Sequence, residues 1–383
     1  MPHAGVAVTP ATHPSGVPAQ PVITAMPCHT RRRHRSIRRW PIPNDAPAVS
    51  RPTTHRPEEV PVSSTRMNPI YLLMEVSASL FCVGAALAAL HRGRMPFLEL
   101  VSAAIFGILL EEGDQLVFET YHYSVDWILT IDRAPIVIGL TWALIIAGAM
   151  RLTDALGVRR RYAPFVDAVL AISLDLAFDA IAIRMGLWTW RGIGADQGWF
   201  GVPAGNFYAW LWVTLAFSLL TRWLRDTAAR RPAREWLQLL VPAPAWIVLL
   251  AGLVPFAVLR PIVDPHLGGG LWLFGVAMAA FGAVAAWGVW GPDRGRPNGE
   301  GVAILHLRLA LLTRVAIHGF FLVGLVGLGL ALKLPVLLGV SLLLLAAEWP
   351  LGRLVHARHG DTAQLRAPAP GDSSPSAASA RLR

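Results

Sequence analysis

The sequence is poor in charged side chains. Only 15% of its 383 residues are Asp, Glu, Lys or Arg, whereas 54% are hydrophobic and the mean hydropathy is +0.48. A soluble globular chain has about a quarter of its residues charged. The deficit therefore argues against a soluble domain and indicates a protein embedded in lipid.

Cysteine is also scarce. Cys28 lies in an N-terminal segment rich in Pro and Arg, and Cys82 lies in an apolar run. Neither belongs to a C-x-x-C motif or a Cys/His cluster, so no disulfide framework, haem attachment or zinc site is indicated. We expect no metal and no cofactor.

Lysine is almost absent, since Lys333 is the only one and arginine supplies the net charge of +10. The arginines lie in the N-terminal segment and in loops between apolar runs. This placement is typical of a positive-inside membrane topology and of attraction to anionic membrane lipid. We therefore expect no nucleic-acid partner.

The two ends of the chain lack apolar periodicity. Residues 1–66 are rich in Pro, Thr, Ser, Ala and Arg, and residues from about 357 to 383 are rich in Ala, Pro and Ser. Such segments bury too little surface to offset their ordering entropy, so we expect both to be disordered. Met67 directly precedes the first apolar run, and we hypothesise that it is the true start of translation.

Nine apolar runs approach the ~20 residues that cross a hydrocarbon core of ~30 Å. They lie near residues 69–90, 97–118, 134–150, 163–183, 204–224, 237–259, 270–290, 308–331 and 335–349. The sequence thus predicts an all-α, polytopic membrane bundle of eight or nine helices, with a short last run that pairs with the eighth. We divide it into a membrane core at 67–235 and additional transmembrane helices at 236–356.

Arginine alternates between the connecting loops. The loops at 91–96, 151–162, 222–236 and 291–307 are rich in arginine, and the intervening loops are poorer. The positive-inside rule places these four loops in the cytoplasm. We therefore expect a multi-pass protein of a bacterial plasma membrane, with the start of the first span outside and the C-terminus inside.

Carboxylates occur inside two of the runs, where each costs about 2.5–3.5 kcal/mol on insertion and is a functional candidate by default. The second run ends in Glu111, Glu112, Asp114 and Glu119, and the fourth contains Asp175 and Asp179, with Asp167 two turns earlier on roughly the same side. The spacing of Asp175 and Asp179 stacks both on one helical face. Because the two runs cross in the same direction, we expect both acidic groups near the same membrane face.

An aromatic segment follows the second acidic group and contains Trp188, Trp190 and Trp199, with Asn206 and Phe207 opening the next run. This segment could form a protein-buried lid over the acids. Alternatively, the tryptophans belong to an interfacial belt, and Asp175 and Asp179 form structural ion pairs with Arg184 or Arg314. His318 is a lone histidine inside the eighth run, and a hydrogen-bonded packing role is the preferred interpretation over a catalytic one.

These residues resemble the membrane carotenoid-biosynthesis proteins, which include carotenoid 1,2-hydratases and bisanhydrobacterioruberin hydratases. The resemblance spans about residues 70–225 and departs from the family pattern at 111–118, where an acidic run replaces a glycine-rich approach. It rests on Asp175-Leu176-Ala177-Phe178-Asp179, Gly186-Leu187-Trp188-Thr189-Trp190, Phe200-Gly201-Val202-Pro203 with Asn206-Phe207, Tyr121-His122-Tyr123, and Pro135 through Trp142.

The resemblance implies hydration of the terminal C1–C2 double bond of an acyclic, lycopene-like carotenoid that enters from the bilayer. The reaction needs no organic cofactor, and other carotenoid biosynthesis enzymes are possible partners. Paired carboxyl groups suit acid and base roles, and aromatic faces stabilise a cation. We assign the acid to Asp175 and Asp179, water to Glu112 or Asp114, orientation to Asn206, and substrate contact to Trp188, Trp190, Trp199, Phe207, Tyr121 and Tyr123.

Two other functions remain open from the residues. A Mg²⁺-dependent membrane prenyltransferase also carries D-x-x-x-D on a helix, although the second acidic group here is Glu-rich and lacks the matching Asp-rich motif. A proton-coupled transporter or carotenoid-binding protein would also use intramembrane acids. The chain has no clear inverted repeat of the kind that many transporters show.

Overall fold

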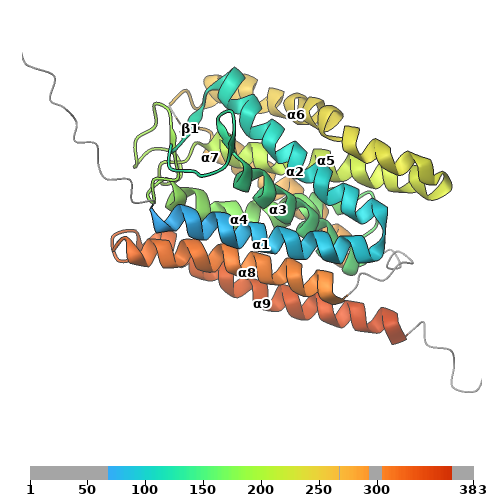
Figure 1. The fold of residues 1–383 in the computed structure, drawn as a ribbon. Coiled ribbons are helices and arrows are strands. Elements are labelled where there is room, and N and C mark those ends of the chain that lie inside the picture. The colour runs from blue at the N-terminus through green and yellow to red at the C-terminus, as the bar shows by residue number, and fades with distance from the viewer. Residues whose placement is uncertain (1–67, 267, 293–303, 365–383) are drawn as a thin grey trace, which may run out of the picture. The chain divides into compact units, whose positions relative to one another are not determined.

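Nine long α-helices make up most of the described chain (Figure 1). The computed structural model describes residues 68–266, 268–292 and 304–364, so the expected N-terminal tail and Met67 lie outside the described residues. The helices are α1 (Pro69–Arg92), α2 (Arg94–Gly113), α3 (Ile136–Ala155), α4 (Ala163–Ala182), α5 (Ala204–Arg230), α6 (Pro242–Val263), α7 (Leu271–Trp290), α8 (Ile304–Gly327) and α9 (Pro335–Gln364).

Seven of these helices are long and apolar enough to cross a membrane, by length and composition. The remaining two, α2 and α4, have 20 residues each but carry three carboxylates apiece. Both pack among the apolar helices, α2 chiefly against α3 and α4 against α5 and α7. The predicted all-α polytopic membrane bundle is confirmed, and its two most acidic helices lie inside it.

Close approach of α2 and α3 depends on two glycines. A Cβ atom on Gly107 would lie 2.6 Å from Cβ of Trp142 and 3.1 Å from Cα of Gly139. A Cβ atom on Gly139 would in turn lie 3.1 Å from the carbonyl oxygen of Ala104. The missing side chains let the two backbones come together and fix the position of Trp142 on α3.

The last helix differs from its prediction. The expected short run at 335–349 is wrong, because α9 continues through Pro350 to Gln364. A proline removes one backbone donor and need not end a helix that is held by its neighbours. The tail expected from residue 357 is therefore helical as far as 364, and α9 packs against α8 as expected.

Short irregular elements close the end of the bundle opposite the α1–α2 turn. The π-helix η1 (Asp114–Phe118) ends α2, and the strand β1 (Tyr121–Tyr123) pairs antiparallel with β4 (Trp188–Trp190), with Tyr121 opposite Trp190. A second ribbon joins β2 (Thr130–Ile131) and β3 (Ala134–Pro135). The 3₁₀-helix η2 (Pro232–Leu240), which links α5 to α6, lies instead at the α1–α2 turn, where its Glu235 is 3.8 Å from Arg94. The aromatic segment is thus tied by a ribbon to the loop after α2.

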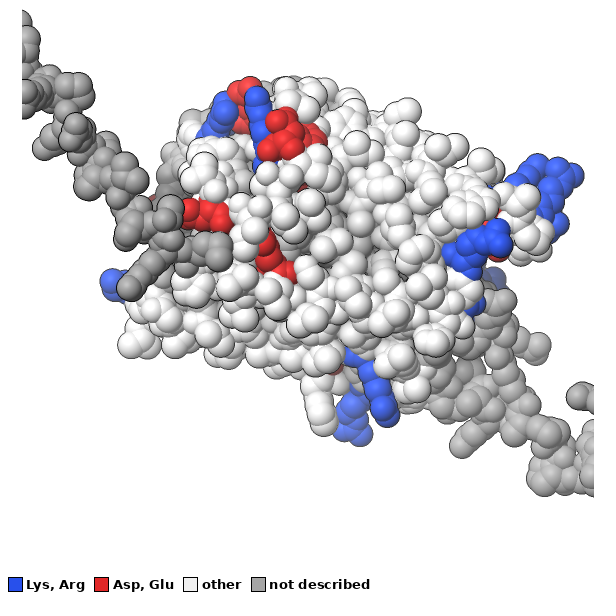
Figure 2. Space-filling model, viewed as in Figure 1, with Lys and Arg blue, Asp and Glu red and all other residues white. Residues whose placement is uncertain are grey.

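Charge separates along the helices. Figure 2 shows basic side chains where α1 meets α2, where α5 ends and near α8 and α9, and most of the acidic side chains, with a few basic ones, at the end opposite the α1–α2 turn; the surface between is largely uncharged. Such a surface is what a hydrocarbon layer requires. The side of the membrane on which each end lies stays a prediction.

A buried ion network occupies the arginine-rich half of the bundle. Arg222 bonds to Asp154 and Asp167, and Arg225 bonds to Glu99 and Asp154. Arg151 adds a contact of 2.8 Å to Glu99. Asp167, two turns before Asp175 on α4, is held in this network by a guanidinium from α5.

We expect Gly107→Ala to lower the stability of the folded protein by about 1–3 kcal/mol, because the new methyl group overpacks the α2–α3 contact. Gly148→Ala on α3 is the matched control, since its nearest new contact would be Cβ of Ala310 at an ordinary 3.6 Å. The midpoint of thermal unfolding in detergent measures both. An unchanged midpoint for Gly107→Ala would contradict the tight packing.

Candidate active site

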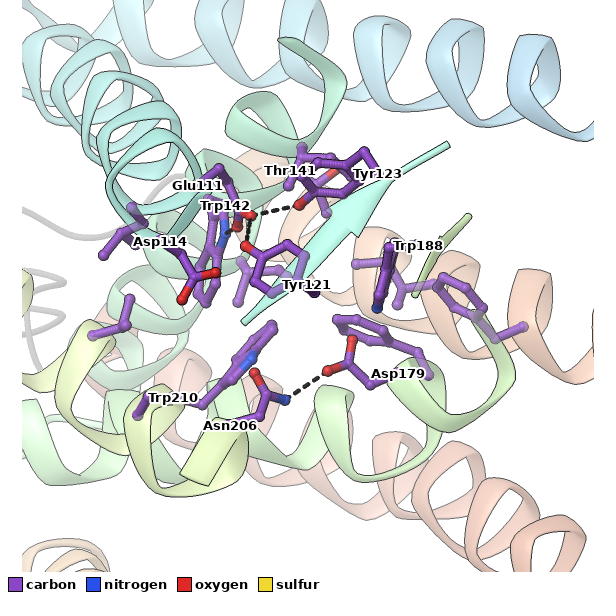
Figure 3. A pocket seen from close by; sticks show the side chains of 18 of the residues that line it. Glu111, Asp114, Tyr121, Tyr123, Thr141, Trp142, Asp179, Trp188, Asn206 and Trp210 are labelled. Atoms are coloured by element: carbon purple, nitrogen blue, oxygen red, sulfur yellow. Dashed lines mark hydrogen bonds between the residues drawn. The ribbon is translucent and has the colours of Figure 1, made fainter. Parts of the chain in front are cut away.

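A largely apolar cavity of about 1190 Å³ lies between the helices at the arginine-poor end (Figure 3). Ordinary small-molecule sites enclose about 300–1,000 Å³, so this cavity suits a large ligand. Side chains from α1, α2, α3, α4, α5, α6 and α8 line it, together with β1 and β4. Polar groups converge on it at two places.

The first polar group joins α4 to α5. The amide Nδ2 of Asn206 donates to Oδ2 of Asp179 at 2.6 Å and to Oδ2 of Asp175 at 2.9 Å. Both carboxyl groups are buried, and Oδ1 of Asp175 has no hydrogen-bond partner among the described residues. Asp179 lines the cavity, whereas Asp175 lies behind it.

The alternative interpretation, in which Asp175 and Asp179 form ion pairs with Arg184 or Arg314, does not hold among the described residues. Arg184 donates instead to the carbonyl oxygens of Ala180 and Phe200. Arg314 binds Glu348 on α9. The two aspartates therefore face neutral donors, and a proton is the simplest charge that can balance one of them.

The second polar group surrounds Glu111. Its Oε2 accepts hydrogen bonds from the hydroxyls of Tyr121 and Tyr123, the latter at 2.5 Å, and its Oε1 accepts from Nε1 of Trp142 at 2.6 Å. Burial, followed by the nearby Glu111 carboxylate, raises the pKa of Tyr121 and Tyr123 well above the usual range. The phenols stay protonated and remain donors at neutral pH.

The turn after α2 brings these tyrosines back over Glu111. Asp114 accepts from the backbone N–H of Thr120 at 3.2 Å and from its hydroxyl at 2.8 Å. Glu119 adopts a left-handed φ of 50°, which reverses the chain into β1. A π-helix is common at functional sites, and here it precedes the turn that brings Tyr121 and Tyr123 to Glu111.

Pairing of β1 with β4 then places aromatic rings beside the acids. The rings of Tyr121 and Trp190 have centroids 4.9 Å apart, and those of Tyr123 and Trp188 are 5.9 Å apart. Figure 3 shows Tyr121 between the Glu111 group and the pair formed by Asp179 and Asn206. The two carboxyl groups thus face one cavity, as their common membrane face predicted.

Most residues that the sequence singles out line the cavity, and four do not. Those on the wall are Asp114, Tyr121, Tyr123, Asp179, Trp188, Trp190 and Asn206; those off it are Glu112, Asp175, Trp199 and Phe207. Glu112 accepts from the backbone N–H groups of Arg133 and Ala134 and so holds the β2–β3 ribbon. Trp199 donates to the carbonyl oxygen of Leu176, and Phe207 packs on Phe274.

The sequence also contained two site residues that the prediction left out. Glu111 was placed in the acidic group but not among the site residues, although it shares a helical face with Asp114 and Gln115. Trp142 closes the proline-led segment at the start of α3. Only the hydrogen bond between them, across 31 positions of sequence, identifies both as one unit.

The charge on the cavity wall has one sign. Glu111, Asp114 and Asp179 line it, and no Lys, Arg or His does so in the described part of the chain. Within that part, no three His, Cys, Asp or Glu side chains are grouped so that they could hold a metal ion. The wall therefore suits a neutral, apolar ligand.

Fold and cavity together define a polytopic α-helical membrane protein with an acid-bearing apolar chamber. A family model described as carotenoid biosynthesis protein matches residues 67–276, more than half of the chain, and the chain belongs to this family. No curated protein and no solved structure matches it. The match extends beyond residues 70–225 and past the boundary set at 235, so it includes α6 and the start of α7 but not α8 or α9.

We expect Glu111→Leu to destabilise the protein strongly, because three buried donors would lose their acceptor at about 1–3 kcal/mol each. Glu111→Gln should cost much less, since its amide oxygen can serve Trp142 while the tyrosine hydroxyls turn to accept from its NH₂ group. Thermal unfolding in detergent compares the two. Equal midpoints for both variants would contradict the three-donor arrangement.

Proposed function

We propose that the protein hydrates the terminal C1–C2 double bond of an acyclic carotenoid. The observation that carries this proposal is the pair of carboxyl groups on one apolar cavity, Asp179 with Asn206 and Glu111 with its three donors. Membership of the carotenoid biosynthesis family supports the biosynthetic role.

The cavity favours a hydrocarbon from the bilayer as substrate. Its volume of about 1190 Å³ exceeds that of ordinary small-molecule sites. Its wall is mostly apolar and bears no cation within the described residues, so an anionic substrate would gain no partner there. A neutral polyene fits these properties.

Protonation comes from the aspartate pair. Two carboxyl groups joined by one amide can share a proton, as like charges this close resist ionising together. Asp179 faces the cavity and delivers this proton to C2 of the substrate, while Asp175 behind it accepts a hydrogen bond from the same amide. The π electrons of the C1–C2 bond form the new C–H bond and leave a tertiary cation at C1.

Aromatic rings and water complete the reaction. The faces of Trp188, Trp190 and Tyr121 stabilise the cation at about 0.5–2 kcal/mol per contact. Water reaches C1 from the side of Asp114, beside the exposed Thr120. The water oxygen bonds to C1, and a proton of this water passes to Glu111. The product has then gained one H₂O. Proton exchange through water between Glu111 and the aspartate pair restores the starting state.

Replacement of the proposed acid should abolish the activity. In a bacterial host that accumulates lycopene, the wild-type chain should form a more polar pigment heavier by one water, measured by liquid chromatography and mass spectrometry. Asp179→Asn and Asp175→Asn should each reduce this product by a factor of about 10² or more, the usual contribution of a general acid.

Glu112→Gln is the matched control. Glu112 is adjacent to Glu111 and accepts hydrogen bonds from backbone N–H groups, and the amide oxygen of glutamine can accept the same hydrogen bonds. Glu112→Gln should retain most of the activity, whereas Glu111→Gln should not. Loss of product in Glu112→Gln with normal product in Glu111→Gln would overturn the assignment of the base.

Removal of Mg²⁺ separates the proposal from the prenyltransferase alternative. Acid–base hydration by side chains should proceed unchanged in isolated membranes treated with a chelator, assayed by the same product. Activity that disappears with the chelator and returns with added Mg²⁺ would support a diphosphate-dependent reaction instead. Substrate-independent proton uptake into proteoliposomes would support transport.

A further inference from the structure

Helix α8 forms part of the cavity although it lies outside the family match. That match ends at residue 276, and α8 begins at Ile304. Its residues on the cavity wall include Ala316, Gly319, Phe320, Val323, Gly324 and Gly327. Their spacing of three and four positions puts them on one face of the helix.

Buried polar bonds fix this face relative to the acid-bearing helix. Arg314 on α8 donates to the carbonyl oxygen of Leu170 at 2.6 Å and to Oγ of Ser173 at 2.8 Å, both on α4. The same guanidinium binds Glu348 of α9 at 2.8 Å, and Nε2 of His318 lies 3.3 Å from that carboxylate. Because α4 also carries Asp179, these bonds fix the position of the cavity-lining face of α8 relative to the Asp179 carboxyl group.

The cavity reaches the lipid-facing surface between α1 and α8. These helices pack side by side (Figure 1). Leu73 of α1 and Val323 of α8 both line the cavity, yet they are 58% and 71% exposed. Both exposed side chains therefore lie where the cavity opens to the surface of the bundle, and this part of the cavity is called the α1–α8 arm.

Glycines keep the arm wide. A Cβ atom added to Gly319 or Gly327 would meet no atom within 4 Å, so the space beside both belongs to the cavity. A Cβ atom at Gly319 would enter that space without displacing protein atoms. The width of the arm therefore depends on the absence of side chains at Gly319 and Gly327 of α8.

We infer that the α1–α8 arm holds the polyene tail of the substrate, and that α8 is a specificity-determining wall for the length of that tail. The substrate class rests on the proposed function. The reacting end lies at Asp179, and the remainder of the chain extends along the glycine face of α8 toward the lipid. This assigns a role in substrate selection to a helix beyond the matched region.

The test is retention of pigment by the full chain, purified in detergent from a host that accumulates an acyclic C40 carotenoid. Absorbance of pigment per protein should fall about tenfold or more in Gly319→Leu, because the side chain occupies the space of the tail. Gly319→Ala should retain an amount of pigment between those of the wild type and Gly319→Leu. This smaller substitution tests the inference even where leucine hinders folding.

Gly282→Leu on α7 is the matched control. Gly282 also has no atom within 4 Å of an added Cβ, and it does not line the cavity. It should retain pigment as the wild type does. Equal retention by Gly319→Leu and Gly282→Leu, or no pigment on the wild type, would overturn the inference.

A second readout separates the inference from the proposed function. Gly319→Leu should still hydrate a short acyclic terpenoid with the same terminal double bond, since only the tail arm is filled. Wild type that retains pigment but hydrates neither substrate would refute the hydratase and leave the tail arm standing. Equal loss of both substrates in Gly319→Leu would contradict a role in tail length.

Discussion

The structure depends on how α4 satisfies its three buried carboxylates. Lipid offers them no water, so each must find a partner within the bundle. Asp167 meets the guanidinium of Arg222 in a network where three arginines balance three acids. Asp175 and Asp179, two and three turns further along the helix, accept hydrogen bonds from the neutral amide of Asn206. The carboxylate in the first half of the helix is therefore paired with arginine, and the two in the second half are held by a neutral amide beside the cavity.

The same division explains what the sequence could predict. Apolar runs predicted eight or nine helices, and the common direction of the second and fourth runs predicted that Glu111 and Asp179 lie near the same membrane face. Periodicity could not separate Asp167 from Asp175 and Asp179, because the distinction comes from Arg222, 55 positions away. Glu111 and Glu112 are likewise adjacent in the sequence, and their roles differ because of distant donors. Trp142 binds Glu111 at the cavity, whereas the backbone N–H of Ala134 binds Glu112 at the β2–β3 ribbon.

Helices α6 and α8 extend the site beyond the part that motifs describe. The motif residues supply acids and aromatic rings. These positions require particular side-chain types, so they form a pattern that can be recognised in the sequence. Cavity walls need only apolar or absent side chains, and Gly319 or Gly327 in a membrane helix has no pattern that identifies it. The acids and aromatic rings of the site were therefore visible in the sequence, whereas the shape of the cavity required the packed helices.

Hydration as proposed requires that water adds to the substrate within the membrane. The most direct measurement supplies isolated membranes containing the protein and an acyclic carotenoid with water labelled by a heavy oxygen isotope, followed by mass spectrometry of the pigments. The account predicts a hydroxylated product that carries the heavy oxygen and has gained both hydrogens of water. A product without the label, or a pigment of unchanged mass from a membrane-inserted protein that retains carotenoid, would contradict it.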